Sequence, residues 1–168
     1  NVLFLNGPGV YESTGRPCKE HWGGAVDAAL HYLEEAQKAK KIVMHGHSLG
    51  AGLIGEGILR HQLKSDVKYL FVADRTFSQL SWVAGGALGL SKTIQWALCV
   101  ILKFLGVELN TQAGIEKILR EGHKAVVISS SNPDGDGVIP ANSSPEVADG
   151  RGIIHIEGDE IDHNKPLP

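Results

Sequence analysis

The hydrophobic positions of this chain follow two different spacings along its length. Short apolar runs predict buried strands, and they lie at residues 2–5, 42–45, 67–73, 125–129 and 153–156. Between them, apolar residues recur three or four positions apart, which predicts helices at residues 26–33, 49–64 and 115–119. This alternation of strands and helices favours an α/β fold with a mostly parallel sheet and helices on both faces.

Residues 80–106 depart from this rhythm because they are rich in apolar residues without belonging to an expected strand. Lys92 and Lys103 interrupt the segment, so no uninterrupted run is long enough to span a bilayer. One interpretation is one or two buried helices. The other is a cap or lid over an active site, with an apolar inner face that would contact an acyl chain. Contact with a membrane surface through the same residues is a further alternative.

The composition is that of one globular domain covering residues 1–168, with 80–106 as its candidate lid. Hydrophobic residues make up 42% and charged residues 21% of the chain, as in ordinary soluble proteins. The net charge of −3 gives no argument for nucleic acid as a partner. Cys18 and Cys99 form no metal or redox spacing, and no signal peptide is visible, so a reducing, cytoplasmic location is expected. The chain opens on a strand-like run without a methionine and stops abruptly, so a fragment lacking its N-terminal strands is also expected.

The stretch Gly46-His47-Ser48-Leu49-Gly50 stands between an expected strand and an expected helix. A chain that turns this sharply needs residues without a Cβ where the two backbones crowd, and the glycines on either side of Ser48 meet that need. This Gly-x-Ser-x-Gly pattern is the nucleophile elbow, which presents a serine hydroxyl clear of its own backbone. The helix start behind it directs the free N–H of Leu49 at the position of an oxyanion. The alternative is a tight turn with a capping serine.

A serine nucleophile needs a base, and position along the chain separates the eight histidines. His163 follows the last expected strand, in the loop GDEIDHNKP, at the edge of the sheet where the strands end. Catalytic groups of open parallel sheets gather at that edge. The other histidines lie next to Ser48, within strands, on helices or before a strand: His21, His31, His45, His47, His61, His123 and His155. The alternative for His163 is a solvated loop histidine.

Three aspartates are candidates for the carboxylate that orients the base. Asp134 and Asp136 follow an expected strand in a glycine-containing loop, and Asp74 ends an earlier strand. Asp136 is favoured because glycines flank it and would let the backbone turn it inward. Asp134 follows a proline and fits a turn. Asp74 is the reserve candidate, and it could instead pair with Arg75.

The same loop can also be interpreted as a calcium site. Asn132, Asp134, Asp136 and Gly137 match the first half of a calcium-binding loop. The position that should carry a glutamate is Ser143, and no helix precedes the loop, which argues against the metal. We expect neither a metal ion nor an organic cofactor.

The segments GHSLGAG, DGDGVIP and DHN, in that order, resemble those of α/β-hydrolase-fold serine hydrolases. NGPGVYESTGRP and ADRTFSQLS are similar to segments of the CHLPS-type hydrolases of Chlamydia-like and Legionella-like bacteria, and of peripheral membrane esterases and depalmitoylases of the same superfamily. The resemblance implies Ser48 as nucleophile, Asp136 as acid and His163 as base, in the chain order of this class. It also implies an upstream strand that gives a second oxyanion donor. That strand is absent from the sequence, which leaves the Gly7–Gly9 loop as a substitute.

Together these observations predict a serine hydrolase that cleaves a carboxylic ester or thioester through an acyl-enzyme on Ser48. The substrate would be a small molecule or an acylated partner with a lipid-like acyl group, and no nucleic acid would take part. A non-catalytic binding module or bacterial effector scaffold on the same fold is the competing hypothesis, because a fold does not decide function. The absent upstream strand supports that alternative, whereas the Ser–Asp–His set argues against it.

Overall fold

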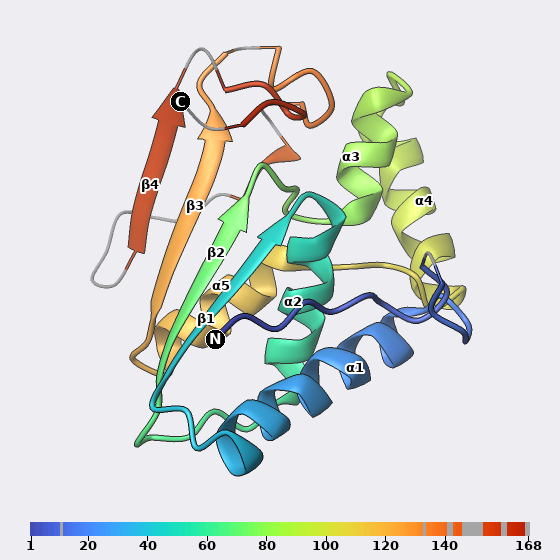
Figure 1. Ribbon diagram of the computed structural model, residues 1–168. Helices are drawn as coiled ribbons and strands as arrows, with labels where there is room; N and C mark the ends of the chain where they lie inside the picture. The colour runs from blue at the N-terminus through green and yellow to red at the C-terminus, as the bar shows by residue number, and fades with distance from the viewer. Residues whose placement is uncertain (11, 133, 141–142, 146–152, 159–160, 167–168) are drawn as a thin grey trace.

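Figure 1 shows the computed structural model of the chain, which describes residues 1–10, 12–132, 134–140, 143–145, 153–158 and 161–166. Four strands form one sheet: β1 (Lys41–His47), β2 (Lys68–Asp74), β3 (Lys124–Ser130) and β4 (Ile153–Gly158). Their order in the sheet is their order in the sequence, and each neighbouring pair is parallel. The four corresponding apolar runs are therefore confirmed as strands of an α/β fold.

Helices connect these strands. α1 (Lys19–His31) continues into the short π-helical segment η1 (Tyr32–Ala36) before β1, and α2 (Leu49–Arg60) follows β1. Between β2 and β3 lie α3 (Leu80–Ala87), α4 (Lys92–Phe104) and α5 (Thr111–Arg120). The three expected helices are confirmed, although α2 ends at Arg60 because His61 has extended backbone angles. No helix within the described ranges is both long enough and apolar enough to cross a membrane.

The strand expected at residues 2–5 is not formed. This segment has no regular secondary structure, and Phe4 is 91% exposed. A strand requires a ladder of backbone hydrogen bonds to a neighbour, and among the described residues none joins this segment to β1. Leu3 and Leu5 instead line a cavity beside α1 and β1. The apolar side chains of this segment therefore serve a cavity wall rather than a sheet.

The main core lies on one face of the sheet. Side chains alternate along β1, so Ile42 and Met44 are buried while Val43 is 64% exposed. Helices α1, α2 and α5 pack on the buried face through large apolar side chains: Val26, Leu30, Ile58, Phe71, Ile115, Ile118 and Val127. On the other face, Ile154 and Ile156 of β4 are exposed. The apolar strands predict helices on both faces, whereas in the described part of the chain the helices cover one.

A smaller core joins α3 to the edge of the sheet where the strands end. Its members are buried together or packed around the buried ones: Trp22, Phe77, Leu109 and Ile139, with Leu53, Leu80 and Val83. Helix α4 contains no buried residue and packs on α3. Figure 1 shows the two helices side by side, standing to one side of the sheet. Residues 80–106 are therefore largely helical, and α3 supplies the contacts of this helix pair with the core.

Candidate active site

Ser48 occupies a sharp turn between the end of β1 and the start of α2. Its φ of 52° and ψ of −122° lie outside the regions favoured by residues with a side chain. Such a conformation costs about 1–3 kcal/mol. The neighbouring chain holds it there, because the Ser48 N–H donates to the Asp74 carbonyl at 2.9 Å and Thr76 Oγ1 donates to the Ser48 carbonyl at 2.8 Å. The end of β2 therefore fixes the turn that carries the serine.

The two glycines of this turn differ in their surroundings. A Cβ on Gly46 would lie 2.5 Å from the backbone of Ala51 in α2, closer than real Cβ contacts allow. A Cβ on Gly50 would meet nothing within 4 Å. The close approach of strand and helix therefore requires glycine at position 46. The expectation that both glycines relieve crowding is wrong for Gly50, because the helix has already turned away from the strand at that point.

His163 and Asp136 form a buried pair at the edge where the strands end. His163 Nδ1 lies 2.9 Å from Asp136 Oδ2, and the two residues are 5% and 6% exposed. A carboxylate can only accept, so Nδ1 carries the proton and Nε2 keeps a lone pair. Asp136 Oδ1 accepts backbone hydrogen bonds from Val138 at 3.0 Å and Ile139 at 2.7 Å. Asp136 is thus oriented by its own loop, and it orients the His163 ring in turn.

Backbone geometry brings the Asp136 and His163 loops together. The His163 N–H donates to the Asp136 carbonyl at 2.9 Å. Gly135 and Gly137 flank Asp136 with φ values of 84° and 89°, which glycine adopts readily. These glycines allow the bend that turns the Asp136 side chain toward His163.

Asp134, in the same loop, has a different environment. It is exposed, and its N–H donates to Asn132 Oδ1 at 3.0 Å in a local turn. Both carboxylate oxygens of Asp136 are already engaged, one by His163 and one by backbone N–H groups. The aspartates of this loop therefore do not present a shared set of free oxygens to a calcium ion.

Asp74, the reserve candidate, is buried at the end of β2. It accepts from Arg75 Nε at 2.7 Å, and its other oxygen lies 3.2 Å from His45 Nε2. Burial alone would raise the pKa of Asp74, but hydrogen bonds from Arg75 and His45 bring that pKa below its usual value. Asp74 is therefore committed to Arg75 and His45, and Asp136 is the candidate aspartate that contacts His163.

Arg75 and His47 tie the His163 loop to the ends of β2 and β1. Arg75 Nη1 donates to the Asp162 carbonyl at 2.8 Å and also to the Lys165 carbonyl. His47 Nε2 lies 2.9 Å from the His163 carbonyl oxygen, and the two rings have centroids 4.8 Å apart. Sequence reasoning missed these contacts of Arg75 and His47, because the partners are backbone carbonyls 87, 90 and 116 positions away.

Ser48 and Leu49 make no direct bond to this pair. Among the described residues, the Ser48 hydroxyl makes no hydrogen bond to the His163 ring. Ser48 follows His47 in the sequence, and the His47 ring contacts His163. The Leu49 N–H, at the positive end of the α2 dipole, likewise has no partner in the described part of the chain. The structure thus brings Asp136 and His163 together, and Ser48 is linked to them through the contact of its neighbour His47 with His163.

A cavity of about 280 Å³ opens beside the elbow. Backbone of the elbow lines one side, and Leu5, Trp22 and Leu53 are among the apolar side chains on the others. Trp22 Nε1 donates to the Pro8 carbonyl at 3.0 Å, which holds the Gly7–Gly9 loop close to this cavity. His45 and His47 also line the cavity, so its walls offer both apolar and polar groups to a ligand.

Comparison with protein families adds the observation that places the chain. The family model described as Chlamydia CHLPS protein (DUF818) matches residues 1–104, more than half of the 168. The chain belongs to this family. The part that matches the CHLPS model contains Ser48, Leu49 and Arg75, whereas Asp136 and His163 lie beyond it.

One solved structure also resembles this CHLPS-family chain. It is the crystal structure of a lipase-esterase related protein from Clostridium acetobutylicum ATCC 824, with a TM-score of 0.49 and 13% sequence identity. The alignment covers 92% of this chain and 73% of that chain. Likeness at this level supports no conclusion about function. No curated protein sequence matches the chain, so its function rests on the geometry of its own site.

Proposed function

We propose that this CHLPS-family protein is a serine hydrolase that cleaves a carboxylic ester or thioester. The observation that supports this most is the buried Asp136–His163 pair beside a serine in a strained strand-to-helix turn. A histidine held by one carboxylate through Nδ1 keeps Nε2 as a base, which is what a serine nucleophile needs. Strained backbone persists where the surrounding structure enforces it, and such positions cluster at active sites.

In the proposed reaction, Ser48 Oγ attacks the substrate carbonyl carbon and its proton passes to His163 Nε2. Asp136 accepts from Nδ1–H and stabilises the imidazolium cation. The carbonyl oxygen becomes an oxyanion and accepts a hydrogen bond from Leu49 N–H. His163 then gives its proton to the leaving alcohol or thiol, while the acyl group stays on Ser48. A water molecule then loses a proton to His163 and attacks the acyl carbon. His163 returns that proton to Ser48 Oγ as the bond to the acyl group breaks and the acid leaves.

The Ser48 hydroxyl must approach His163 for this reaction. Catalytic hydrogen bonds are often long or poorly aligned before substrate binds. The backbone of Ser48 is held by Asp74 and Thr76, so we expect the approach to come from rotation about the Cα–Cβ bond of Ser48. We expect a bound substrate analogue to bring Oγ within about 2.6–3.2 Å of Nε2.

The surroundings of the site favour an apolar acyl group. The cavity beside the elbow has apolar side chains in its walls. Leu80 and Val83 of α3 pack against the small core that includes Ile139, which lies in the loop that carries Asp136. Helix α3 thus stands next to the proposed site, and with α4 it would act as a lid over the acyl group.

Helix α4 supports placing that substrate at a lipid surface. Its exposed face is apolar and aromatic, with exposed fractions of 52%, 70%, 53% and 90% at Ile94, Trp96, Ile101 and Phe104. Lys92 and Lys103 are its charged residues, and residues 80–107 contain no acidic one. Helices with an apolar face and basic residues bind at the interface of anionic bilayers. We therefore include contact with an anionic membrane surface through α4 in the proposed function.

A fluorophosphonate probe, which reacts with an activated serine, tests the proposal. Wild-type protein should be labelled on Ser48, and Ser48→Ala should not be labelled while keeping its circular dichroism spectrum. Ser65→Ala removes an exposed serine outside the site and should be labelled like the wild type. Equal labelling of the wild type and Ser48→Ala would show the nucleophile assignment to be wrong.

A non-catalytic binding module is the competing function. Two observations favour it: Ser48 and His163 share no hydrogen bond among the described residues, and Leu49 is the single oxyanion donor that we assign. A folded wild-type protein that resists the probe and cleaves neither aryl esters nor acyl thioesters would decide for the binding module.

A further inference from the structure

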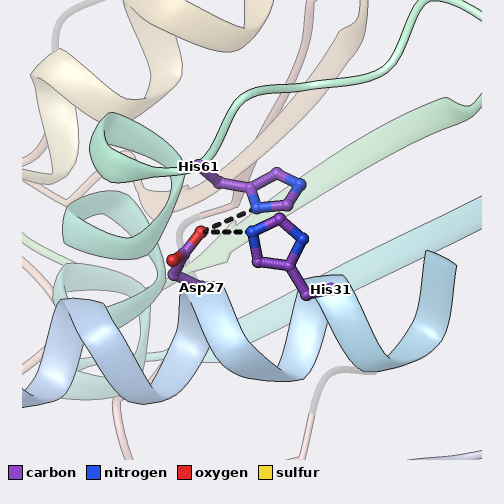
Figure 2. A group of neighbouring side chains, drawn as sticks. All are labelled: Asp27, His31 and His61. Carbon is purple, nitrogen blue, oxygen red and sulfur yellow. Dashed lines mark hydrogen bonds and ion pairs between the residues drawn. The ribbon is translucent and has the colours of Figure 1, made fainter. Parts of the chain in front are cut away.

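A second cluster of reactive side chains lies at the opposite end of α2 from Ser48. Asp27 and His31 are one turn apart on α1, and His61 is the first residue after α2. Figure 2 shows the three side chains pointing toward one another between the two helices. The 12 residues of α2 lie between this cluster and Ser48, a helical rise of about 18 Å. The proposed hydrolase mechanism uses none of the three residues.

The donor atoms of the cluster have nearly the spacing of metal ligands. Asp27 Oδ1 lies 2.8 Å from His61 Nδ1 and 3.7 Å from His31 Nε2. One donor atom from each residue lies within 4.8 Å of the other two. Around a tetrahedral Zn²⁺ with bonds of about 2.0–2.2 Å, ligand atoms stand about 3.2–3.6 Å apart. Small shifts of three side chains would therefore admit the ion.

His61 also has the outer contacts that a metal-binding histidine uses. Its Nε2 lies 2.7 Å from Glu34 Oε1, which accepts from the Tyr69 hydroxyl at 2.6 Å. The side chains of His61 and Glu34 are fully buried. Ligating histidines donate their second ring N–H to a carboxylate in the same way, which fixes the ring orientation. The contact with Glu34 turns Nδ1 of His61 toward Asp27.

The charges around His61 also fit a bound cation. The two ring nitrogens face carboxylate oxygens of Asp27 and Glu34, which attract positive charge. Glu34 Oε2 makes no hydrogen bond within the described residues and lies 3.6 Å from Lys64 Nζ. An ion bound to His61 Nδ1 would place positive charge between Asp27 and Glu34. It would also take His31 as a ligand.

We propose that Asp27, His31 and His61 bind a Zn²⁺ ion, with water as the fourth ligand and Glu34 as the outer partner of His61. Two imidazole nitrogens and one carboxylate oxygen suit zinc, whereas calcium and magnesium prefer oxygen ligands alone. The side chains of His31 and Asp27 are 56% and 31% exposed, which leaves the ion a path from solvent. The ion joins α1 to the end of α2 and stabilises their packing.

Titration of the metal-free chain with Zn²⁺, followed by calorimetry, tests this site. We expect one ion per chain and a higher Tm in the presence of Zn²⁺. Co²⁺ in place of Zn²⁺ should give visible d–d absorption of the intensity typical of tetrahedral coordination. This spectrum distinguishes a coordinated ion from one held loosely at the surface.

The variant His31→Ala is the decisive test. The side chain of His31 is exposed, so its removal should not disturb folding. Loss of this ligand should weaken Zn²⁺ binding at least about tenfold and remove the rise in Tm. His21→Ala is the matched control, since His21 is exposed on the same helix and lies 3.0 Å from the Arg16 carbonyl oxygen. It should bind Zn²⁺ like the wild type. No binding by the wild type, or equal affinities of the two variants, would overturn the proposal.

Discussion

Two buried histidines of this protein have different carboxylate partners: His163, in the loop after β4, and His61, directly after α2. His163 contacts one carboxylate, that of Asp136, through Nδ1 at 2.9 Å. His61 contacts Asp27 through Nδ1 at 2.8 Å and Glu34 through Nε2 at 2.7 Å. The first arrangement leaves one ring nitrogen for proton transfer, whereas the second engages both. Burial alone therefore does not indicate what a histidine does; the number of carboxylates around its ring is the better guide.

Among these substitutions, replacing Asp136, the one carboxylate that contacts His163, should have the largest effect, and the effect should be on turnover. Asp136→Asn should lower the turnover of an aryl ester about 10⁴-fold, because an amide no longer holds the required tautomer or stabilises the imidazolium. The amide oxygen can still accept from the N–H groups of Val138 and Ile139, so the fold should persist. Asp134→Asn, in the same loop but exposed, is the control and should keep wild-type turnover. Equal losses in both variants would remove the special role of Asp136.

Removal of His61, which contacts two carboxylates, should instead lower the free energy of unfolding. His61→Leu leaves Asp27 and the buried Glu34 without their shared partner, so we expect the free energy of unfolding to fall by about 3–5 kcal/mol. Urea denaturation measures the change. His21→Leu, which replaces an exposed histidine, should stay within about 0.5 kcal/mol of the wild type. Similar free energies of unfolding for the two variants would contradict this prediction, because Asp27 and Glu34 would then not depend on His61.

Arg75 tests how firmly the His163 loop is held. Arg75→Lys keeps a positive charge beside Asp74 but loses the fork that reaches the carbonyls of Asp162 and Lys165. We expect kcat for ester cleavage to fall about 10–100-fold with little change in KM, because His163 would be less well positioned. Steady-state kinetics over a range of ester concentrations separates the two constants.

Arg120→Lys, on the exposed side of α5, is the matched control for this substitution and should leave the kinetics unchanged. If Arg75→Lys also leaves kcat unchanged, Asp136 alone orients His163. Rescue of activity in Arg75→Lys by a change elsewhere in the His163 loop would support the positioning role.

Glu108 is a buried carboxylate with no histidine partner among the described residues, and its replacement should have the smallest effect, on the pH dependence of stability. Glu108 accepts from the Ser81 N–H at 3.3 Å and hydroxyl at 2.9 Å, and its other oxygen has no partner among the described residues. Burial raises the pKa of Glu108 above its ordinary value of 4.5, although the bonds from Ser81 oppose this. The folded state then holds this proton more tightly than the unfolded state. Its contribution to stability therefore falls as pH rises from 4.5 through the raised folded pKa.

Glu108→Gln should remove this fall. The free energy of unfolding of the variant, relative to the wild type, should increase in urea titrations as the pH rises above 4.5 through the raised folded pKa of Glu108. Glu12→Gln replaces an exposed glutamate and should show no such trend. A difference between Glu108→Gln and wild type that stays constant with pH would mean that Glu108 titrates normally in the folded protein.

The sheet could be predicted where the residues of a single strand decide the outcome. The runs at residues 42–45, 67–73 and 125–129 carry enough apolar side chains to be buried in an α/β core, and they form β1, β2 and β3. Residues 2–5 have the same character, but a strand there depends on a ladder with β1 that does not form. Which face of the sheet the helices cover also depends on tertiary packing, which no single strand records. Val43 is as apolar as its neighbours in β1, yet it is 64% exposed.

The candidate site could be predicted where local pattern or strand direction is sufficient. Gly46 and Ser48 mark the turn by their spacing, and parallel strands place the loops of Asp136 and His163 at one edge. The pair of Asp74 with Arg75 was open to prediction because the two residues are neighbours in the sequence, whereas the contacts of Arg75 with the carbonyls of a distant loop were not.

The second cluster illustrates the same limit. Asp27 and His31 are four positions apart on one helix face, which the sequence displays. His61 joins them only because α1 packs against α2, and no local pattern records that contact.

The left-handed backbone at Ser48 would set stability against the proposed activity. Glycine adopts a φ of 52° with no side chain to strain. Ser48→Gly should therefore be roughly 1 kcal/mol more stable than the wild type, and it would have no nucleophile. Drift in the absence of any need for the hydroxyl would favour glycine at this position. If Ser48 is the nucleophile, a relative that has glycine at this position and lacks the activity is expected to be the more stable protein.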